Sequence, residues 1–133
     1  MISHPKMIKF DETLKQIFDE IDDYLEDKYG DLYSLHPNRL KRGEASNKSH
    51  DGLFNVGASY TAGFGSAYGK GYAIEIKMVT LEEIDPLHAD EIENNVKELL
   101  EKKLFEFFPE RKLYVNKDGH CLKIYGDFSL GSL

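Results

Sequence analysis

Apolar residues follow a helical period in two stretches of the chain, and a two-residue period of the kind typical of strands in the segments after each stretch. In residues 10–29 the apolar positions fall on one side of the expected helix: Phe10, Leu14, Ile17, Phe18, Ile21 and Tyr24. Gly30 supplies a stop. The second helix is expected to begin at Asp85-Pro86, where Asp can cap it and Pro suits the first turn, and to end before Pro109.

The segment after the first helix predicts a long β-hairpin. Its apolar residues alternate with polar or small ones along two runs: Phe54, Val56, Ala58 and Tyr60, then Tyr72, Ile74, Ile76 and Met78. A tip near Ser66, in a glycine-rich turn, would place Val56 opposite Ile76 and Ala58 opposite Ile74. The apolar faces of the two strands then match.

A second hairpin is predicted around Asp118-Gly119, the dipeptide favoured in two-residue type I′ turns because both central residues need positive φ. This register sets Lys117 opposite His120 and Tyr114 opposite Lys123. One side of the ribbon is then apolar and the other polar.

The order of elements is therefore αββαββ, which predicts an α+β fold with two helices on one face of a four-stranded antiparallel sheet. It resembles a ferredoxin-like βαββαβ chain whose first strand has moved to the end, which would put residues 120–127 in the sheet centre beside residues 70–80. The analogy is topological and implies no function. The 133 residues suit a single domain, in which residues 36–51 form a long loop that is either flexible or involved in binding.

Charge is distributed unevenly along the chain. Residues 10–35 and 81–101 each carry a net −7, whereas residues 36–80 carry a net +3. Solvated acidic helix faces explain this pattern, and an acidic surface directed at a basic partner is the alternative. No apolar run suggests a signal peptide or a membrane span, and Cys121 is the single cysteine. We therefore expect a cytoplasmic protein that has no cofactor and does not contact a membrane.

One enzymatic alternative is a metal-dependent nuclease built on Asp51, Glu75 and Lys77, because Asp…Glu-x-Lys resembles the metal site of restriction-endonuclease-like nucleases. Glu75 and Lys77 share a strand face. In the predicted register, however, Glu75 lies opposite Gly57, and Asp51 is six residues further along the strand, about 20 Å away. Two ligands of one metal ion cannot be so far apart.

Other candidate motifs are weaker. The glycine-rich residues 63–71 resemble a phosphate-binding loop, but a strand follows them where a helix would be required, so a hairpin tip is favoured. His120 and Cys121 point to opposite strand faces and cannot act as a pair. Without a catalytic constellation, the sequence favours a protein that is not an enzyme.

The sheet face opposite the helices is the leading candidate for function. The registers place there Asn55, Glu75, Lys77, Lys112, Tyr114, Asn116, Lys123 and Tyr125. Interleaved tyrosines and lysines suit self-association, a protein partner or single-stranded nucleic acid, although the acidic net charge disfavours nucleic acid. The sequence thus predicts a binding or assembly domain that uses this face and the aromatic hairpin tip, with six candidate binding residues: Lys77, Tyr114, Lys123, Tyr125, Phe64 and Tyr68.

Overall fold

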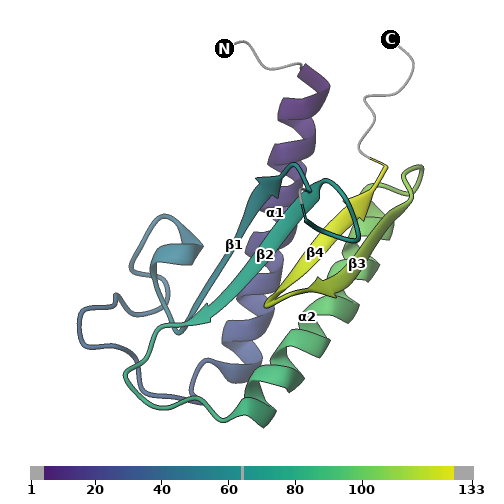
Figure 1. Ribbon diagram of the computed structural model, residues 1–133. Helices are drawn as coiled ribbons and strands as arrows, with labels where there is room; N and C mark the ends of the chain where they lie inside the picture. The colour runs from purple at the N-terminus through teal and green to yellow at the C-terminus, as the bar shows by residue number, and fades with distance from the viewer. Residues whose placement is uncertain (1–4, 64, 128–133) are drawn as a thin grey trace.

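The computed structural model describes residues 5–63 and 65–127 and confirms the predicted order of elements (Figure 1). The elements are helix α1 (Pro5–Tyr29), a short 3-10 helix η1 (Lys48–His50), strands β1 (Phe54–Thr61) and β2 (Gly71–Met78), helix α2 (Pro86–Phe107), and strands β3 (Leu113–Asp118) and β4 (Cys121–Gly126). None of the described helices combines the length and the apolar character that a membrane span requires.

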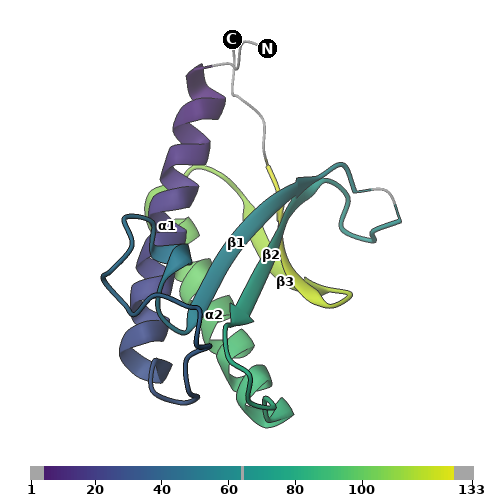
Figure 2. The same ribbon diagram turned by 90° about the vertical axis from the view of Figure 1, so that its left-hand side faces the viewer.

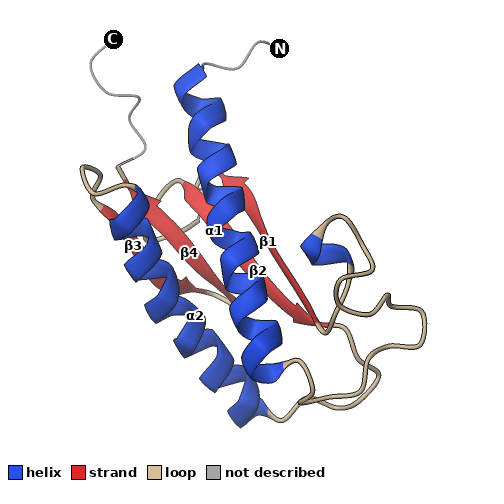
Figure 3. Cartoon of the chain, turned by 180° about the vertical axis from the view of Figure 1, so that it is seen from behind, coloured by secondary structure: helices blue, strands red, loops and turns tan. Residues whose placement is uncertain are grey.

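The four strands form one antiparallel sheet in the order β1-β2-β4-β3. Strand β4 therefore lies in the centre beside β2, as the permuted ferredoxin-like order predicts. Both helices cover the same face of this sheet, which Figure 3 shows from the helix side. The core lies between the layers and is built from the apolar faces of both helices and of all four strands. Its deeply buried members include Ile17, Ile21, Leu25, Leu53, Phe54, Ile74, Ile92, Val96, Leu100, Leu122 and Ile124.

The ends of α2 lie where the sequence predicts them. Asp85 caps the helix, its Oδ1 accepting a hydrogen bond of 2.9 Å from the Leu87 N–H, and Pro86 is the first helical residue. Helix α1 starts five residues before the predicted position Phe10, because Pro5 opens an additional turn and a half.

The long hairpin has the predicted register, with Val56 opposite Ile76 and Ala58 opposite Ile74. For the second hairpin the predicted register was wrong by two residues. Asp118 pairs with Cys121, so Gly119 and His120 are the central turn residues. Gly119 has φ of 68° and His120 has no positive φ, which is the pattern of a type II′ turn rather than type I′. Because the shift is even, every side chain keeps its predicted face.

Residues 36–51 are connected to the rest of the fold by partly buried hydrogen bonds rather than by long regular elements. Arg39 donates to the carbonyl oxygens of Asp51, Gly52 and Phe54 at 3.0–3.1 Å. The Asp51 carboxylate accepts hydrogen bonds from the backbone N–H groups of Gly43 and Ala45, each at 2.9 Å. These hydrogen bonds connect the loop to the start of β1 and link its two halves.

The basic loop lies on the acidic face of α1. Arg42 pairs with Asp27 at 2.7 Å, and Lys48 pairs with Asp23 at 2.8 Å. The segmental charge seen in the sequence is thus partly neutralised within the molecule, which leaves less acidic surface for a basic partner.

Candidate binding surfaces

The glycine-rich hairpin tip folds back over the sheet face opposite the helices. We call the described residues of this connection between β1 and β2, 62–63 and 65–70, the strap. Figure 2 shows the strap on the side of the sheet away from α1 and α2. The two predicted candidate sites, the open face and the hairpin tip, therefore form one surface. Of the predicted tip residues, Tyr68 is part of this surface, and Phe64 lies outside the described residues.

The strap is attached to the sheet through Lys123 of β4. The Lys123 Nζ donates to Ser66 Oγ at 3.0 Å and to the Gly69 carbonyl oxygen, and lies 3.4 Å from the Asp118 carboxylate. Ser66 Oγ in turn donates to Asp118 Oδ2 at 2.6 Å. Lys123 is 2% exposed, so its charge is compensated inside the protein and is not offered to a partner.

Three tyrosine rings lie in a row across this surface. The ring centroids of Tyr68 and Tyr125 are 4.5 Å apart with an interplanar angle of 26°, and those of Tyr125 and Tyr114 are 5.5 Å apart at 31°. Asn116 Nδ2 donates to the Tyr125 hydroxyl at 2.6 Å. Tyr68 is 37% exposed and Tyr114 is 49% exposed. We call these three residues the tyrosine face.

The remaining predicted site residues are placed differently from expectation. Tyr114 pairs with Tyr125 and not with Lys123, because Asp118 stays in β3, where its carboxylate reaches Ser66 and Lys123. Lys77 is exposed on the same sheet face but four residues along β2 from Ala73, the partner of Lys123, which is about 13 Å. Lys77 is therefore not part of the tyrosine face.

Sequence reasoning missed two groups of residues at this surface. Ser66 and Asp118 make the polar contacts of the strap. The sequence of a glycine-rich hairpin tip does not indicate that the tip folds back onto the sheet. A groove of about 540 Å³ also follows β3, lined in part by Leu104, Phe105, Arg111 and Tyr114. Phe105 is 73% exposed, and its position off the apolar stripe of α2 is the signal that could have revealed it.

The three residues of the nuclease alternative, Asp51, Glu75 and Lys77, are not brought together. The Asp51 carboxylate is buried and binds the loop N–H groups of Gly43 and Ala45, whereas Glu75 is exposed and pairs with Gly57, as predicted. Within residues 5–63 and 65–127, no group of three or more acidic, histidine or cysteine side chains is arranged to hold a metal ion.

Buried carboxylates lie between α1 and the loop. Asp22, Glu26 and Asp51 are each at most 7% exposed. Glu26 accepts a hydrogen bond of 2.7 Å from the Phe54 N–H, but no group in the described part of the chain bonds to Asp22 Oδ2. Burial, followed by the charges of Glu26, Asp23 and Asp51, raises the pKa of Asp22 to about 7, against the opposing effect of Lys48. Burial also raises the pKa of Glu26.

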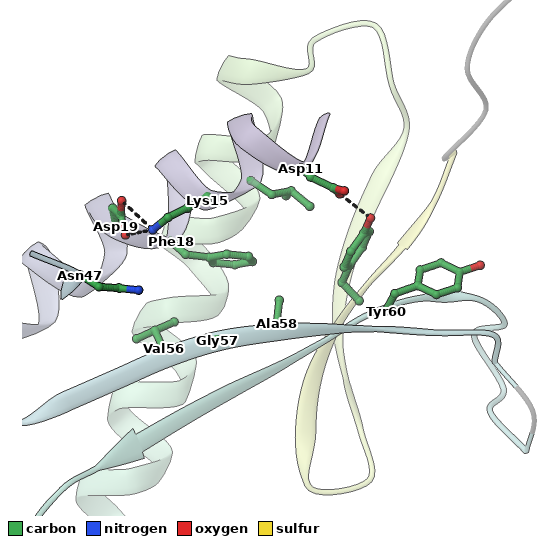
Figure 4. Close-up of a pocket in the computed structure, with 11 residues that line it drawn as sticks. Asp11, Lys15, Phe18, Asp19, Asn47, Val56, Gly57, Ala58 and Tyr60 are labelled. Carbon is green, nitrogen blue, oxygen red and sulfur yellow. Dashed lines mark hydrogen bonds and ion pairs between the residues drawn. The ribbon is translucent and has the colours of Figure 1, made fainter. Parts of the chain in front are cut away.

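A second groove, of about 510 Å³, separates α1 from the outer strand β1 (Figure 4). Leu14, Phe18, Val56, Ala58 and Tyr72 supply its apolar lining. Its rim is polar. Lys15 and Asp19 form an ion pair at 3.4 Å, and Asp11 accepts a hydrogen bond of 2.9 Å from the Tyr72 hydroxyl. Burial, followed by that hydrogen bond, raises the pKa of Tyr72 to about 12.

A protein family described as "Uncharacterised protein" matches residues 5–126, from the first residue of α1 to the last of β4. The chain belongs to this family. An "Uncharacterized protein" of Borreliella burgdorferi is 38% identical to it over 123 residues, which cover 92% of this chain and 96% of the relative. No solved structure matches the chain. Neither description names an activity or a partner.

Proposed function

We propose that this protein is a non-enzymatic binding domain that holds a protein partner on its tyrosine face. The observation that carries the proposal is the row of three tyrosine rings in mutual contact, exposed at Tyr68 and Tyr114. Such rings give a large contact area and carry a polar hydroxyl, and aromatic residues are enriched at interface hot spots.

The tyrosine face is fixed before a partner arrives. Tyr68 is positioned by the strap, which Lys123 holds on the sheet, and Tyr125 is held by Asn116. Rings that already contact one another lose little side-chain entropy on binding, so more of the contact energy is available for affinity.

Basic and aromatic residues next to the tyrosine face enlarge the binding surface and suit a partner whose own surface is acidic. Phe105 and Arg111 line the groove along β3 with Tyr114, and Lys112 is exposed next to them. Arginine and aromatic side chains together are typical of interface centres. Because the chain has a net charge of −7, this local basic and aromatic area would orient a partner whose own surface is acidic.

The polar groups beneath the strap support binding rather than catalysis. A serine nucleophile needs a neighbouring base that can accept its proton. Ser66 donates to Asp118, but that hydrogen bond, with Lys123 assisting, lowers the pKa of the Asp118 carboxyl. A carboxylate stabilised in this way is a poor base.

Single-stranded nucleic acid is the second candidate, because bases can stack on exposed tyrosines. Lys70, which precedes the partner residue of Tyr125 in β2, is exposed and could contact a phosphate. The burial of Lys123 removes one of the cations on which this alternative depended.

The experiment compares the wild type with a Tyr68→Ser, Tyr114→Ser double variant. Immobilised protein is exposed to extract of its own cells, the bound proteins are identified, and the dissociation constant is measured with the purified partner. Loss of two aromatic anchors should weaken binding about 100-fold. Leu87→Ser is the control, because Leu87 is 75% exposed on α2 and outside this surface.

Two results would contradict the proposal. A partner that binds the double variant as tightly as the wild type would place binding elsewhere. The second contradicting result would come from fluorescence anisotropy with a single-stranded oligonucleotide. An affinity for the oligonucleotide that falls steeply with salt and is lost in the double variant would favour nucleic acid as the ligand.

A further inference from the structure

Strand β1 is the outer strand of the sheet beside the groove of Figure 4, and its free edge can be identified from its hydrogen bonds. The Phe54 N–H donates to Glu26 Oε1, and the Phe54 carbonyl oxygen accepts from Arg39 Nη2. Both backbone groups of Phe54 therefore point away from β2. By the two-residue period of a strand, those of Val56, Ala58 and Tyr60 point outward as well.

This outward edge ends in unpaired backbone groups. In the described part of the chain, no hydrogen bond joins the outward N–H or C=O groups of Ala58 and Tyr60 to another residue. Asn47 and η1 lie beside the Val56 end of the strand, so the free portion is its second half. An unpaired strand edge is a template for another strand.

The edge of β1 also lacks the features by which proteins normally protect an outer strand. From Gly52 to Gly69 the sequence contains neither a charged residue nor a proline. The opposite edge, β3, carries Lys117 and Asp118 and is preceded by Lys112. Charges and prolines block edge-to-edge pairing, so β3 is protected and β1 is not.

We propose that two copies of this chain pair edge to edge and antiparallel through β1, so that their two sheets become one continuous sheet. A two-fold axis at Ser59 sets Ala58 of each copy opposite Tyr60 of the other. Both residues have outward backbone groups, so each facing pair exchanges two hydrogen bonds.

A second copy is the occupant that fits this edge best. Tyr60 is 59% exposed and in this register lies opposite Ala58, whose small side chain lines the groove, so the large Tyr60 side chain of each copy covers the groove beside Ala58 of the other. The interface is self-complementary, as two-fold symmetry requires. The paired strands themselves are uncharged, and the groove beside them carries the Lys15–Asp19 ion pair, so charge repulsion between two chains of net charge −7 is reduced at this edge.

Pairing through β1 does not depend on the tyrosine face, but it determines how the tyrosine faces of the two copies are oriented. A two-fold axis perpendicular to the sheet keeps the helices of both copies on one side and both tyrosine faces on the other. The dimer would therefore present two binding surfaces in the same direction, which favours partners with repeated sites.

Light scattering tests the proposal directly. The wild type should have a mass of about 31 kDa, twice the 15.3 kDa of the chain, and Tyr60→Lys should return it to the monomer. Tyr60 is exposed, so this change should leave the fold intact, which circular dichroism verifies. Tyr114→Lys is the matched control, because it places the same charge on an exposed tyrosine of the other outer strand, and its mass should remain that of the dimer.

Hydrogen exchange provides a second, residue-specific measurement. In the wild type the amides of Ala58 and Tyr60 should become at least tenfold more protected as the concentration rises through the dimerisation range, and Tyr60→Lys should abolish that change. A monomeric wild type at millimolar concentration would overturn the proposal. A dimer that survives Tyr60→Lys, or one that is lost in Tyr114→Lys instead, would also overturn it, and the latter would assign dimerisation to the tyrosine face.

Discussion

Replacing Asp22 by asparagine should stabilise the protein at neutral and alkaline pH. Asp22 is 4% exposed, its Oδ2 has no hydrogen bond from the described residues, and it faces Glu26 and Asp23 of α1, Asp51 of the loop and Lys48 of η1. Its ionised form is therefore disfavoured in the folded state. Asparagine has nearly the same shape and carries no charge.

The magnitude follows from the pKa of Asp22, which rises from 3.8 to about 7 on folding. The folded protein binds the proton more tightly than the unfolded chain, so the contribution of Asp22 to stability is complete below pH 3.8 and is lost as the pH rises to 7. At about 1.4 kcal/mol per pKa unit, the full loss is about 4 kcal/mol. The asparagine amide brings its own desolvation cost of about 1–2 kcal/mol, so a net gain of about 2–3 kcal/mol is expected at pH 8.

Urea unfolding of the wild type and Asp22→Asn at pH 5 and pH 8 provides the measurement. The difference between the two proteins should be about 2–3 kcal/mol larger at pH 8 than at pH 5, because only the wild type loses a bound proton over this range. Asp90→Asn, on the exposed side of α2, is the control and should change stability equally at both pH values. Equal effects of Asp22→Asn at both pH values would refute the assignment of a buried, destabilised carboxylate.

Further predictions concern the strap and the core. Lys123→Met should lower the free energy of unfolding by about 2–3 kcal/mol, because it removes the ion-pair partner of the Asp118 carboxylate, and it should speed amide exchange in the strap. Lys77→Met, which changes an exposed lysine on the same sheet face, should do neither. Ile74→Asp should unfold the domain by placing a charge in the core, whereas Lys77→Asp should leave the circular dichroism spectrum unchanged. Gly63→Ala should loosen the strap by the same exchange measurement, since Gly63 has φ of 89° and an added Cβ would lie 2.2 Å from backbone; normal exchange would contradict its role.

Much of the fold could be predicted because its elements are specified by local patterns. The alternation from Phe54 to Met78 determined the register of the first hairpin, since a slip of one residue would expose its apolar face. The turn at Asp118-Gly119 could not be placed by the same reasoning. Its local preference was for type I′, but contacts of Asp118 with Ser66 and Lys123, which are distant in sequence, favoured the other register.

The candidate site was harder to predict than the fold. The tyrosines were found because alternation assigns each of them to a sheet face. That Lys123 is buried could not be found in this way, because it depends on the strap folding over the sheet. Glycines permit such a path without encoding it. The free edge of β1 also required the structure, since the direction of a backbone N–H follows from hydrogen-bond partners such as Glu26.

The permuted strand order determines when this domain can fold during its synthesis. Strand β4 is the last of the described elements along the chain, yet it joins β2 to β3 in the centre of the sheet. On the ribosome, α1 with the first hairpin and α2 with β3 emerge as two parts that no strand pairing connects. Until residues 121–126 follow, the inner edge of β2 is open to incorrect partners. Completion of the sheet must therefore wait for its central strand, and chaperones that shield strand edges would act before that point.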